Sequence, residues 1–290
     1  PQTITITGVD DLQDDGDQEY FIILDVATSA DPNYNGLDPD DVTVNNFNDD
    51  TAGIVILPTT GLTTTETGGT ATFTVVLSSQ PMADVTFGLA SSNTAEGTIS
   101  TSSVTFTAAN WNTPQTITVT GIDDSSNDGD VVYSIVAAAA TSADFRYDNL
   151  DADDAQITNI DDDEVGVTVT PTSGLTTTEA GGSAFFSIVL NSRPTANVTI
   201  SLASSQPGEG TLSASSVTFT AANWSVAQTV TITGVDDFRD DDDIAYTIIT
   251  GDAASTDSDY SLFDVDDVAV TNIDDDDSGI LVSPTSGLMT

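Results

Sequence analysis

Residues 114–124 read PQTITVTGIDD, and this stretch decides how the chain is organised. Nearly the same sequence opens the chain as PQTITITGVDD at 1–11 and returns as AQTVTITGVDD at 227–237. The three copies begin 113 residues apart each time, without insertion or deletion. Such a period is too long for a solenoid repeat and suits an independent domain. We therefore predict tandem domains.

The repeat spacing divides the chain into four segments. We predict the C-terminal half of a repeat at 1–52, complete repeats at 53–165 and 166–278, and the first strand of a further repeat at 279–290. Both ends fall inside a repeat, which predicts that the sequence is a window on a longer array.

Polar and apolar residues alternate within each copy, and this pattern predicts β-strands. Thr, Val, Ile and Phe dominate the predicted strands, whereas Gly, Pro, Asn and Asp separate them. In the first complete repeat the predicted strands are 54–66 (broken near Pro58 and Gly61), 70–77, 84–89, 104–107, 115–122, 131–137 and 155–160. No stretch supports a helix of useful length. Seven short strands in about 110 residues predict an all-β, Ig-like, Greek-key sandwich, repeated head to tail.

The composition limits the function classes. The chain has 290 residues, 47 acidic and three basic, a formal charge of −44, and neither His nor Cys. Phosphate would be repelled, so we expect no nucleic-acid partner. The longest apolar run, 131–140, is too short to span a bilayer, so no membrane insertion is expected in these residues. A 38% hydrophobic content is enough to form cores, which argues against a disordered acidic tail.

The acids stand in blocks, and six of the 47 are Glu. One block, here called the acidic loop, is 123–130, and another, the aspartate run, is 161–163. If successive strands alternate in direction, the segments that follow 54–66, 84–89, 115–122 and 155–160 all lie at one pole of the sandwich. The carboxylates expected there are Glu66, Glu96, Asp123, Asp124, Asp128, Asp130, Asp161, Asp162 and Asp163.

The other copies predict equivalent poles. In the second complete repeat the candidate ligands are Glu179, Glu209, Asp236, Asp237, Asp241, Asp243, Asp274, Asp275 and Asp276. In the half-repeat they are Asp10, Asp11, Asp15, Asp17, Asp49 and Asp50.

The negative charges of acids this close together need a compensating positive charge. Two like charges 4 Å apart repel by roughly 4 kcal/mol at an effective dielectric of about 20, against a domain stability of about 5–15 kcal/mol. A solvated acidic rim of a salt-adapted protein is one reading, and a bound hard cation is the other. The acids cluster, recur in each repeat and converge on one pole, and these three features favour Ca²⁺, which takes many carboxylate oxygens. We expect roughly two to four ions per pole. Without His or Cys, zinc, copper and iron–sulfur sites are poor candidates.

The residues GTISTSSVTFTAANWNTPQTITVTGIDD at 97–124, followed by AQITNIDDDEVGV at 155–167, resemble the Calx-β domain of sodium–calcium exchangers and large bacterial surface proteins. The resemblance implies an Ig-like sandwich with Ca²⁺ at one tip. It implies ligand roles for Glu66, for acids of the acidic loop and for the aspartate run. Glu96 departs from the family pattern, in which an Asp often occupies a slightly different loop position. The exchangers' membrane segments have no counterpart, so transport is not implied.

Several other residues have both a functional and a structural interpretation. The connection at 141–154 carries Asp144 and other recurring acids at the opposite pole, where a further ion and a polar loop are both open. Trp111 and Trp224 are predicted to plug the core rather than to stack on a sugar. Paired carboxylates could serve a glycosidase, but these are crowded and repeated, so no enzymatic activity is expected.

The leading hypothesis is a structural extracellular array, acting as a fibre, matrix filament or adhesin stalk that Ca²⁺ stiffens at poles and junctions. Its expected partners are neighbouring repeats and, in a filament, identical chains. The alternative is an adhesive module that recognises glycan or protein in a Ca²⁺-dependent way, and a calcium buffer or sensor is a third idea. Tandem, near-identical copies resemble bacterial extracellular arrays, which implies a prokaryotic cell surface.

Overall fold

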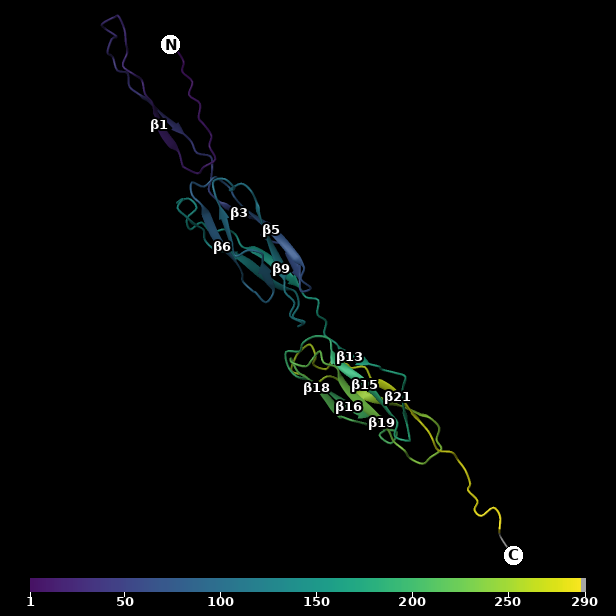
Figure 1. Ribbon diagram of the computed structural model, residues 1–290. Helices are drawn as coiled ribbons and strands as arrows, with labels where there is room; N and C mark the ends of the chain where they lie inside the picture. The colour runs from purple at the N-terminus through teal and green to yellow at the C-terminus, as the bar shows by residue number, and fades with distance from the viewer. Residues whose placement is uncertain (288–290) are drawn as a thin grey trace. The chain divides into compact units, whose positions relative to one another are not determined.

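The structure, a computed structural model, describes residues 1–287 (Figure 1). The described chain contains strands and loops but no helix, which confirms the predicted all-β class. It accordingly has no helix that is long and apolar enough to cross a membrane. Contacts between residues group the chain into two compact units, 1–124 with 129–161, and 125–128 with the residues from 162 onward.

The first unit contains a sandwich of two sheets. One sheet has the strand order β3-β5-β9-β7 and the other β11-β6-β10-β12-β4, with β8 also paired to β6. The bounds of the first sheet are β3 Ile54–Leu57, β5 Thr70–Leu77, β9 Gln115–Gly121 and β7 Gly97–Ile99. Those of the second are β11 Thr141–Ser142, β6 Val85–Ser91, β10 Val131–Ala137, β12 Ala155–Ile160, β4 Leu62–Thr65 and β8 Ser103–Phe106.

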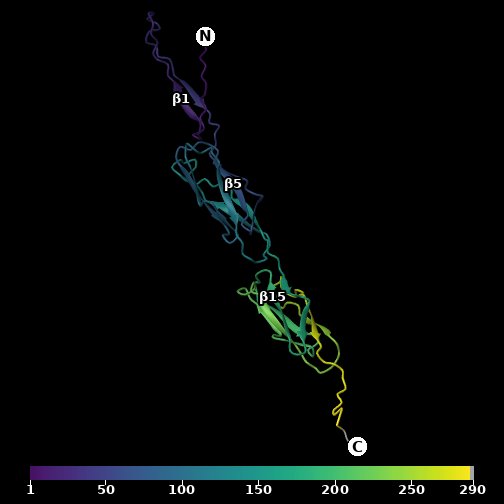
Figure 2. The same ribbon diagram turned by 45° about the vertical axis from the view of Figure 1, so that its right-hand side comes forward.

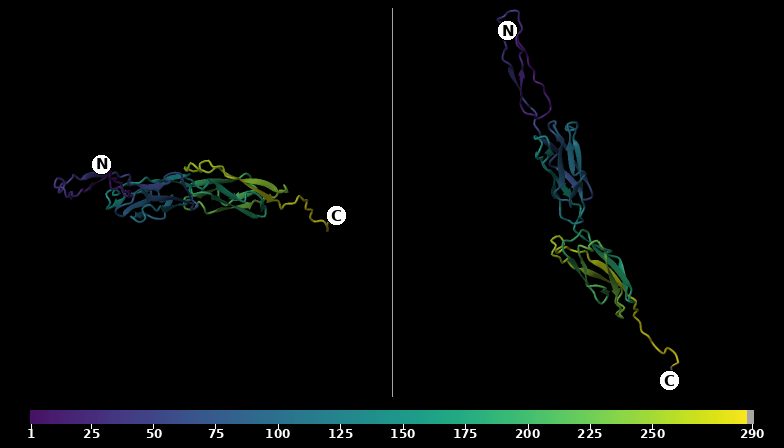
Figure 3. Two further views of the ribbon diagram at one scale, coloured as in Figure 1. Left: turned by 90° about the horizontal axis from the view of Figure 1, so that it is seen from above. Right: turned by 60° about the vertical axis from the view of Figure 1, so that its left-hand side comes forward.

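The second unit repeats this topology, with sheet orders β13-β15-β19-β17 and β14-β21-β20-β16-β18. The bounds are β13 Val167–Thr170, β14 Leu175–Thr178, β15 Ser183–Leu190, β16 Val198–Ser204, β17 Gly210–Leu212, β18 Ser216–Phe219, β19 Gln228–Gly234, β20 Ile244–Thr250 and β21 Val268–Ile273. Figure 2 and Figure 3 show the units from other sides, and strands and loops account for the described chain in each view.

Period-two alternation places one face of each sheet in the core. Phe73, Ile117 and Ile157 lie on three different strands, and each is at most 1% exposed. Full burial of such a side chain contributes about 1.5–3 kcal/mol. Trp111 and Trp224 are partly buried against their respective cores, as predicted.

The first strand of each sandwich changes sheets partway along. β3 pairs with β5 in one sheet, whereas β4 pairs in parallel with β12 in the other, with Thr64 opposite Asn159. Pro58 and Gly61 fall in the gap between the two halves, where the sequence predicted a break. Because β4 and β12 run in the same direction, the acids that follow them emerge at the same pole.

The seven predicted strands are all present, with small shifts at their ends. Two short strands were missed, β7 and β11, of three and two residues, because so few residues show no alternation. The predicted strand at 104–107 is β8, and it joins the same sheet as β6.

The N-terminal segment is less regular. β1 (Gln18–Ile22) and β2 (Val42–Asn46) form a two-stranded sheet. Residues 2–8, which match β9 in the repeat, form no strand, and Ile4 is 76% exposed. At the other end, residues 279–287 form no strand, and 288–290 lie outside the described residues. A strand needs a hydrogen-bonded neighbour. The equivalent segments of the complete repeats, β3 and β13, pair with β5 and β15, whereas 279–287 pairs with no strand among the described residues.

Candidate metal centre

The pole of the second unit is built by strands that end together. β14 and β21 pair in parallel, and the N–H of Glu179, just after β14, donates to the carbonyl oxygen of Ile273 at 3.1 Å. Asp274 follows β21 directly, and Asp236 begins the acidic loop of this repeat, 236–243, after β19. Three segments that are distant in sequence therefore bring their acids to one place.

Glu179 belongs to two groups of three carboxylates at this pole. Carboxylate oxygens of Glu179, Asp236 and Asp275 lie within 4.8 Å of one another, as do those of Glu179, Asp274 and Asp276. Glu179 is only 3% exposed. Among the described residues, no hydrogen-bond donor reaches its Oε2 or the Oδ2 of Asp276. A buried acceptor without a donor is costly, and a cation at this position would remove that cost.

The electrostatics point the same way. Burial, and then the charge of Asp274, raise the pKa of Glu179 to about 7 from an ordinary value of 4.5. Burial, followed by the charges of Asp236 and Asp274, also raises the pKa of Asp276. Carboxylates in this arrangement resist ionising together, so a proton or a metal ion is needed to neutralise them.

Acids of the acidic loop and of the run after β21 also accept hydrogen bonds from backbone N–H groups. The carboxylate of Asp274 accepts a hydrogen bond from the N–H of Asp242 at 3.1 Å, and Asp243 accepts one from the N–H of Asp274 at 3.2 Å. Asp240 accepts from the N–H of Ser278 at 2.7 Å, and hydrogen bonds from the side chain and then the backbone of Ser278 lower the pKa of Asp240. The predicted ligands Asp237, Asp241 and Asp243 stand outside the two groups of three that include Glu179.

The first unit shows the same design. Carboxylate oxygens of Glu66 and Asp123 lie within 4.8 Å of each other, and those of Glu96 and Asp124 do so as well. Glu66 is 3% and Glu96 4% exposed. Asp161 accepts a hydrogen bond from the N–H of Gly129 at 2.7 Å and donates its own N–H to Asp130 at 3.3 Å. The remaining predicted ligands, Asp128, Asp162 and Asp163, belong by their contacts to the second unit.

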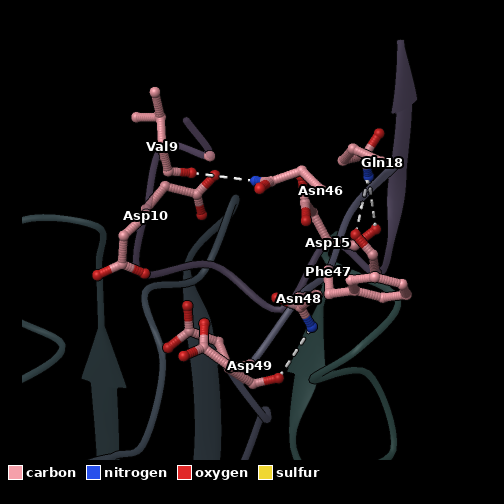
Figure 4. A pocket seen from close by; sticks show the side chains of 12 residues that line it. Val9, Asp10, Asp15, Gln18, Asn46, Phe47, Asn48 and Asp49 are labelled. Carbon is pink, nitrogen blue, oxygen red and sulfur yellow. Dashed lines mark hydrogen bonds between the residues drawn. The ribbon is translucent and has the colours of Figure 1, made fainter. Parts of the chain in front are cut away.

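The half-repeat has an open version of this pole. Carboxylate oxygens of Asp10, Asp49 and Asp50 lie within 4.8 Å of one another. They line a cavity of about 430 Å³, to which Asp11 and Asp15 also contribute (Figure 4). Burial, and then the charge of Asp49, raise the pKa of Asp50.

Two further residues of the half-repeat pole are engaged with its backbone. The predicted ligand Asp17 accepts a hydrogen bond from the N–H of Asn48 at 3.0 Å. Asn48 stands where the complete repeats have the first aspartate of the run, and its side chain donates to the carbonyl oxygen of Asp50 at 3.0 Å. This departure from the repeat pattern therefore replaces a carboxylate with a local hydrogen-bond donor.

The acids of the opposite pole hold turns in place. Asp144 is 5% exposed and accepts hydrogen bonds from the N–H groups of Met82 and Arg146. Asp257 accepts from Thr195 and Asp259 in the same way. Burial alone would raise the pKa of Asp257, but these hydrogen bonds outweigh burial and lower it. Of the two readings of this segment, the polar loop fits these two residues.

One pair of residues was missed in the sequence. Asn159 and Asn272 are each 1% exposed, and each donates to a glutamate of the pole, Glu96 or Glu209. The signal was available, since the two asparagines stand 113 residues apart, in AQITNI and VAVTNI, at inward-facing positions where the other residues on that face are apolar.

No protein-family model matches the chain, and no curated protein matches it. Among solved structures, the chain is similar to CBD12 from CALX1.2, at 14% identity over 75% of this chain and 98% of that one, with a TM-score of 0.33. The calcium binding domain CBD12 of CALX1.1 is 14% identical over 66% of this chain and 77% of that one, with a TM-score of 0.33. The S-layer protein SbsC domains 4 and 5 are 15% identical over 65% and 75%, with a TM-score of 0.29.

Proposed function

We propose that this chain belongs to a structural extracellular array, a fibre, matrix filament or adhesin stalk, whose sandwiches bind Ca²⁺ at their poles. One observation carries the proposal. Glu179 is buried, its Oε2 has no hydrogen-bond donor among the described residues, and it lies within 4.8 Å of the carboxylates of Asp274 and Asp276. A bound cation would supply the missing partner.

The donor set selects the ion. Glu179, Asp236 and the acids at 274–276 offer only oxygen, and the sequence has neither His nor Cys. Ca²⁺ accepts about six to eight oxygen ligands in irregular, partly bidentate arrangements, whereas Mg²⁺ keeps several of its waters. A crowded set of carboxylates from three segments suits Ca²⁺ better.

The same ions would order the loops that meet a following repeat. In the first unit, the carbonyl oxygen of Leu12 accepts a hydrogen bond from the N–H of Gln80 at 2.6 Å. The equivalent pair in the second unit is Ser125 and Arg193, at 2.8 Å. Leu12 and Ser125 belong to acidic segments, so an ion that orders the segment also supports this bond. Repeated along an array, this coupling would give a stiff stalk with no catalytic role.

Thermal unfolding with Ca²⁺ and with EGTA tests the proposal. Ca²⁺ at one hundred times its Kd stabilises by about 2.7 kcal/mol for each site. For a domain of this size that corresponds to a rise in Tm of roughly 10–20 °C. Equimolar Mg²⁺ should give a much smaller rise. An unchanged Tm, together with no heat of binding in isothermal titration, would contradict calcium binding.

The structural role has its own test. Small-angle scattering of the whole chain should show more bending in EGTA than in Ca²⁺. Replacing Asp162 and Asp163 by Asn should increase bending even in Ca²⁺. A scattering profile that is the same in all these conditions would contradict the proposed stalk role, although it would not contradict calcium binding. Catalytic turnover on glycan substrates would contradict the proposal more broadly.

A further inference from the structure

A buried asparagine stands near the end of the last strand in both complete repeats. Asn159 lies in β12, two residues before Asp161, and Asn272 lies in β21, two residues before Asp274. Each is 1% exposed. An amide is costly to bury unless its donors and acceptor are satisfied, so its partners show what it does.

Asn159 bonds to three other segments of the chain. Its Nδ2 donates to the Oε2 of Glu96 at 3.2 Å and to the carbonyl oxygen of Ile122 at 3.0 Å. Its Oδ1 accepts from the hydroxyl of Thr64 at 2.9 Å. Both amide hydrogens meet acceptors and the oxygen meets a donor, so the orientation of the amide is determined by its partners.

Asn272 makes the same three bonds in the second complete repeat. Its Nδ2 donates to the Oε2 of Glu209 at 3.3 Å and to the carbonyl oxygen of Val235 at 3.2 Å. Its Oδ1 accepts from the hydroxyl of Thr177 at 2.8 Å. The recurrence shows that the arrangement belongs to the repeat.

Each partner stands beside an acid of the pole. Thr64 is two residues before Glu66, and Ile122 directly precedes Asp123. Glu96 is itself one of these acids, and its carboxylate lies within 4.8 Å of that of Asp124. A single amide thus connects all four acid-bearing segments of the sandwich.

The backbone leaves room for this network at two glycines. A Cβ on Gly121 would overlap the Oδ1 of Asn159 and the carbonyl oxygen of Thr65, and a Cβ on Gly97 would overlap the hydroxyl of Tyr133. Gly234 and Gly210 stand in the same relation to Asn272 and Tyr246. Any larger residue at these positions would push the amide or the phenol out of place.

We propose that Asn159 and Asn272 are positioning residues of the calcium poles. They hold the carboxylates of Glu96 and Glu209, and the base of each acidic loop, in place before the ion arrives. Partners that orient a ligand reduce the ordering that binding must otherwise impose. The inference rests on the proposed calcium binding and adds to it the residues that determine affinity.

Two paired variants of the full chain separate positioning from simple packing. In the first, Asn159→Ala and Asn272→Ala remove the amides. In the matched control, Tyr147→Phe and Tyr260→Phe remove buried phenols at the opposite pole, which lie 2.9 and 3.0 Å from the hydroxyls of Ser79 and Ser192 and take no part in the network. Ca²⁺ affinity is measured by isothermal titration and by Tb³⁺ luminescence, and Tm is measured in EGTA.

The asparagine variant should bind Ca²⁺ about 10–100-fold more weakly, the usual cost of losing an outer-shell partner. The tyrosine variant should lower Tm in EGTA and keep nearly the original affinity. If both variants bind Ca²⁺ as the original chain does, the network is structural only and the inference is wrong. If the original chain itself binds no Ca²⁺, the proposed function fails first and the inference falls with it.

A milder variant covers the case in which the alanine chain does not fold. Thr64→Val with Thr177→Val keeps the side-chain shape and removes only the hydroxyls that orient the amides. A several-fold loss of Ca²⁺ affinity is expected, with circular dichroism unchanged. Unaltered affinity in this folded variant would overturn the inference.

Discussion

The pole of the second complete repeat and the pole of the half-repeat share their acidic loop and most of the acids after the last strand, yet they differ in burial. The first contains Glu179 at 3% exposure, within 4.8 Å of the carboxylates of two neighbouring aspartates. The second has Asp10 and Asp49 exposed around an open cavity of about 430 Å³. The difference lies in the strands that complete the sandwich.

The asparagine network shows the same contrast. Asn272 has partners on three segments, whereas the equivalent Asn46 donates to the carbonyl oxygen of Val9 at 3.1 Å (Figure 4). The acids of the half-repeat thus stand beside the two-stranded sheet of β1 and β2, whereas Glu179 and the partners of Asn272 lie among strands of two sheets. Four experiments test how the two poles differ.

The largest effect is expected from Glu179→Gln, which removes the shared carboxylate of the complete pole. Ca²⁺ affinity of that repeat should fall by more than the roughly 10–100-fold cost of an outer-shell change. In EGTA the same variant should have a higher Tm, because repulsion from Asp274 is relieved. Titration calorimetry with Ca²⁺ checks the loss of affinity, and scanning calorimetry in EGTA checks the rise in Tm. Asp49→Asn, in the half-repeat, is the control and should change neither value for the second repeat.

The pH dependence of the metal-free chain comes next. The folded-state pKa of Glu179 is raised to about 7 from 4.5, so the folded form holds this proton more tightly than the unfolded form. The resulting stability is fully present below pH 4.5 and is lost as the pH rises through about 7. Denaturant unfolding in EGTA should therefore give a lower midpoint at pH 8 than at pH 5, and Glu179→Gln should reduce the difference. Equal midpoints for the original chain would contradict the burial of this carboxyl.

A smaller effect is expected from Arg146→Ala. Arg146 pairs with Asp14 of the half-repeat at 2.8 Å, with side-chain exposures of 32% and 11%. Such a partly exposed pair contributes about 1 kcal/mol or less to the free energy of unfolding. The loss should shrink in about 1 M NaCl, where the screening length falls to about 3 Å. Arg239→Ala is the control, because Arg239 is 77% exposed and 3.9 Å from Asp237.

The smallest effect is expected from Asn48→Asp, which restores a run of three aspartates in the half-repeat. The variant loses the donor to the carbonyl oxygen of Asp50 and adds a charge beside it. Tm in EGTA should fall by a degree or two, an effect of a few tenths of a kcal/mol. Ca²⁺ should reverse this fall if the open pole binds the ion, and Tb³⁺ luminescence checks it. A fall that persists in Ca²⁺ would show that acids alone do not complete the open pole.

Much of the fold could be predicted from local pattern. The strands at 70–77, 131–137 and 155–160 match β5, β10 and β12 residue for residue, because β-branched residues alternate cleanly there. β7 and β11 have too few residues to show a period. The pairing of β4 with β12 was not predicted either, since a parallel contact between residues about 95 apart leaves no local trace.

The candidate site divides in the same way. The alternating direction of successive strands predicted that Glu179 and Asp236 would approach the acids after the last strand. In the structure their carboxylate oxygens lie within 4.8 Å of those of Asp275. Strand direction could not anticipate that Asp243 and Asp274 accept backbone hydrogen bonds, because loop conformation decides that. Nor did it find Asn272, although an asparagine recurs at this inward-facing position in both complete repeats, because its partners lie on other segments.

The repeat, the all-β class and the segments that carry the acids follow from the amino-acid sequence alone, because each depends on local periodicity and spacing. Only the tertiary structure decided which carboxylates are buried and which amide connects them. Burial and hydrogen-bond partnership depend on residues 37 to 95 positions apart meeting across two sheets, and no local pattern encodes that meeting.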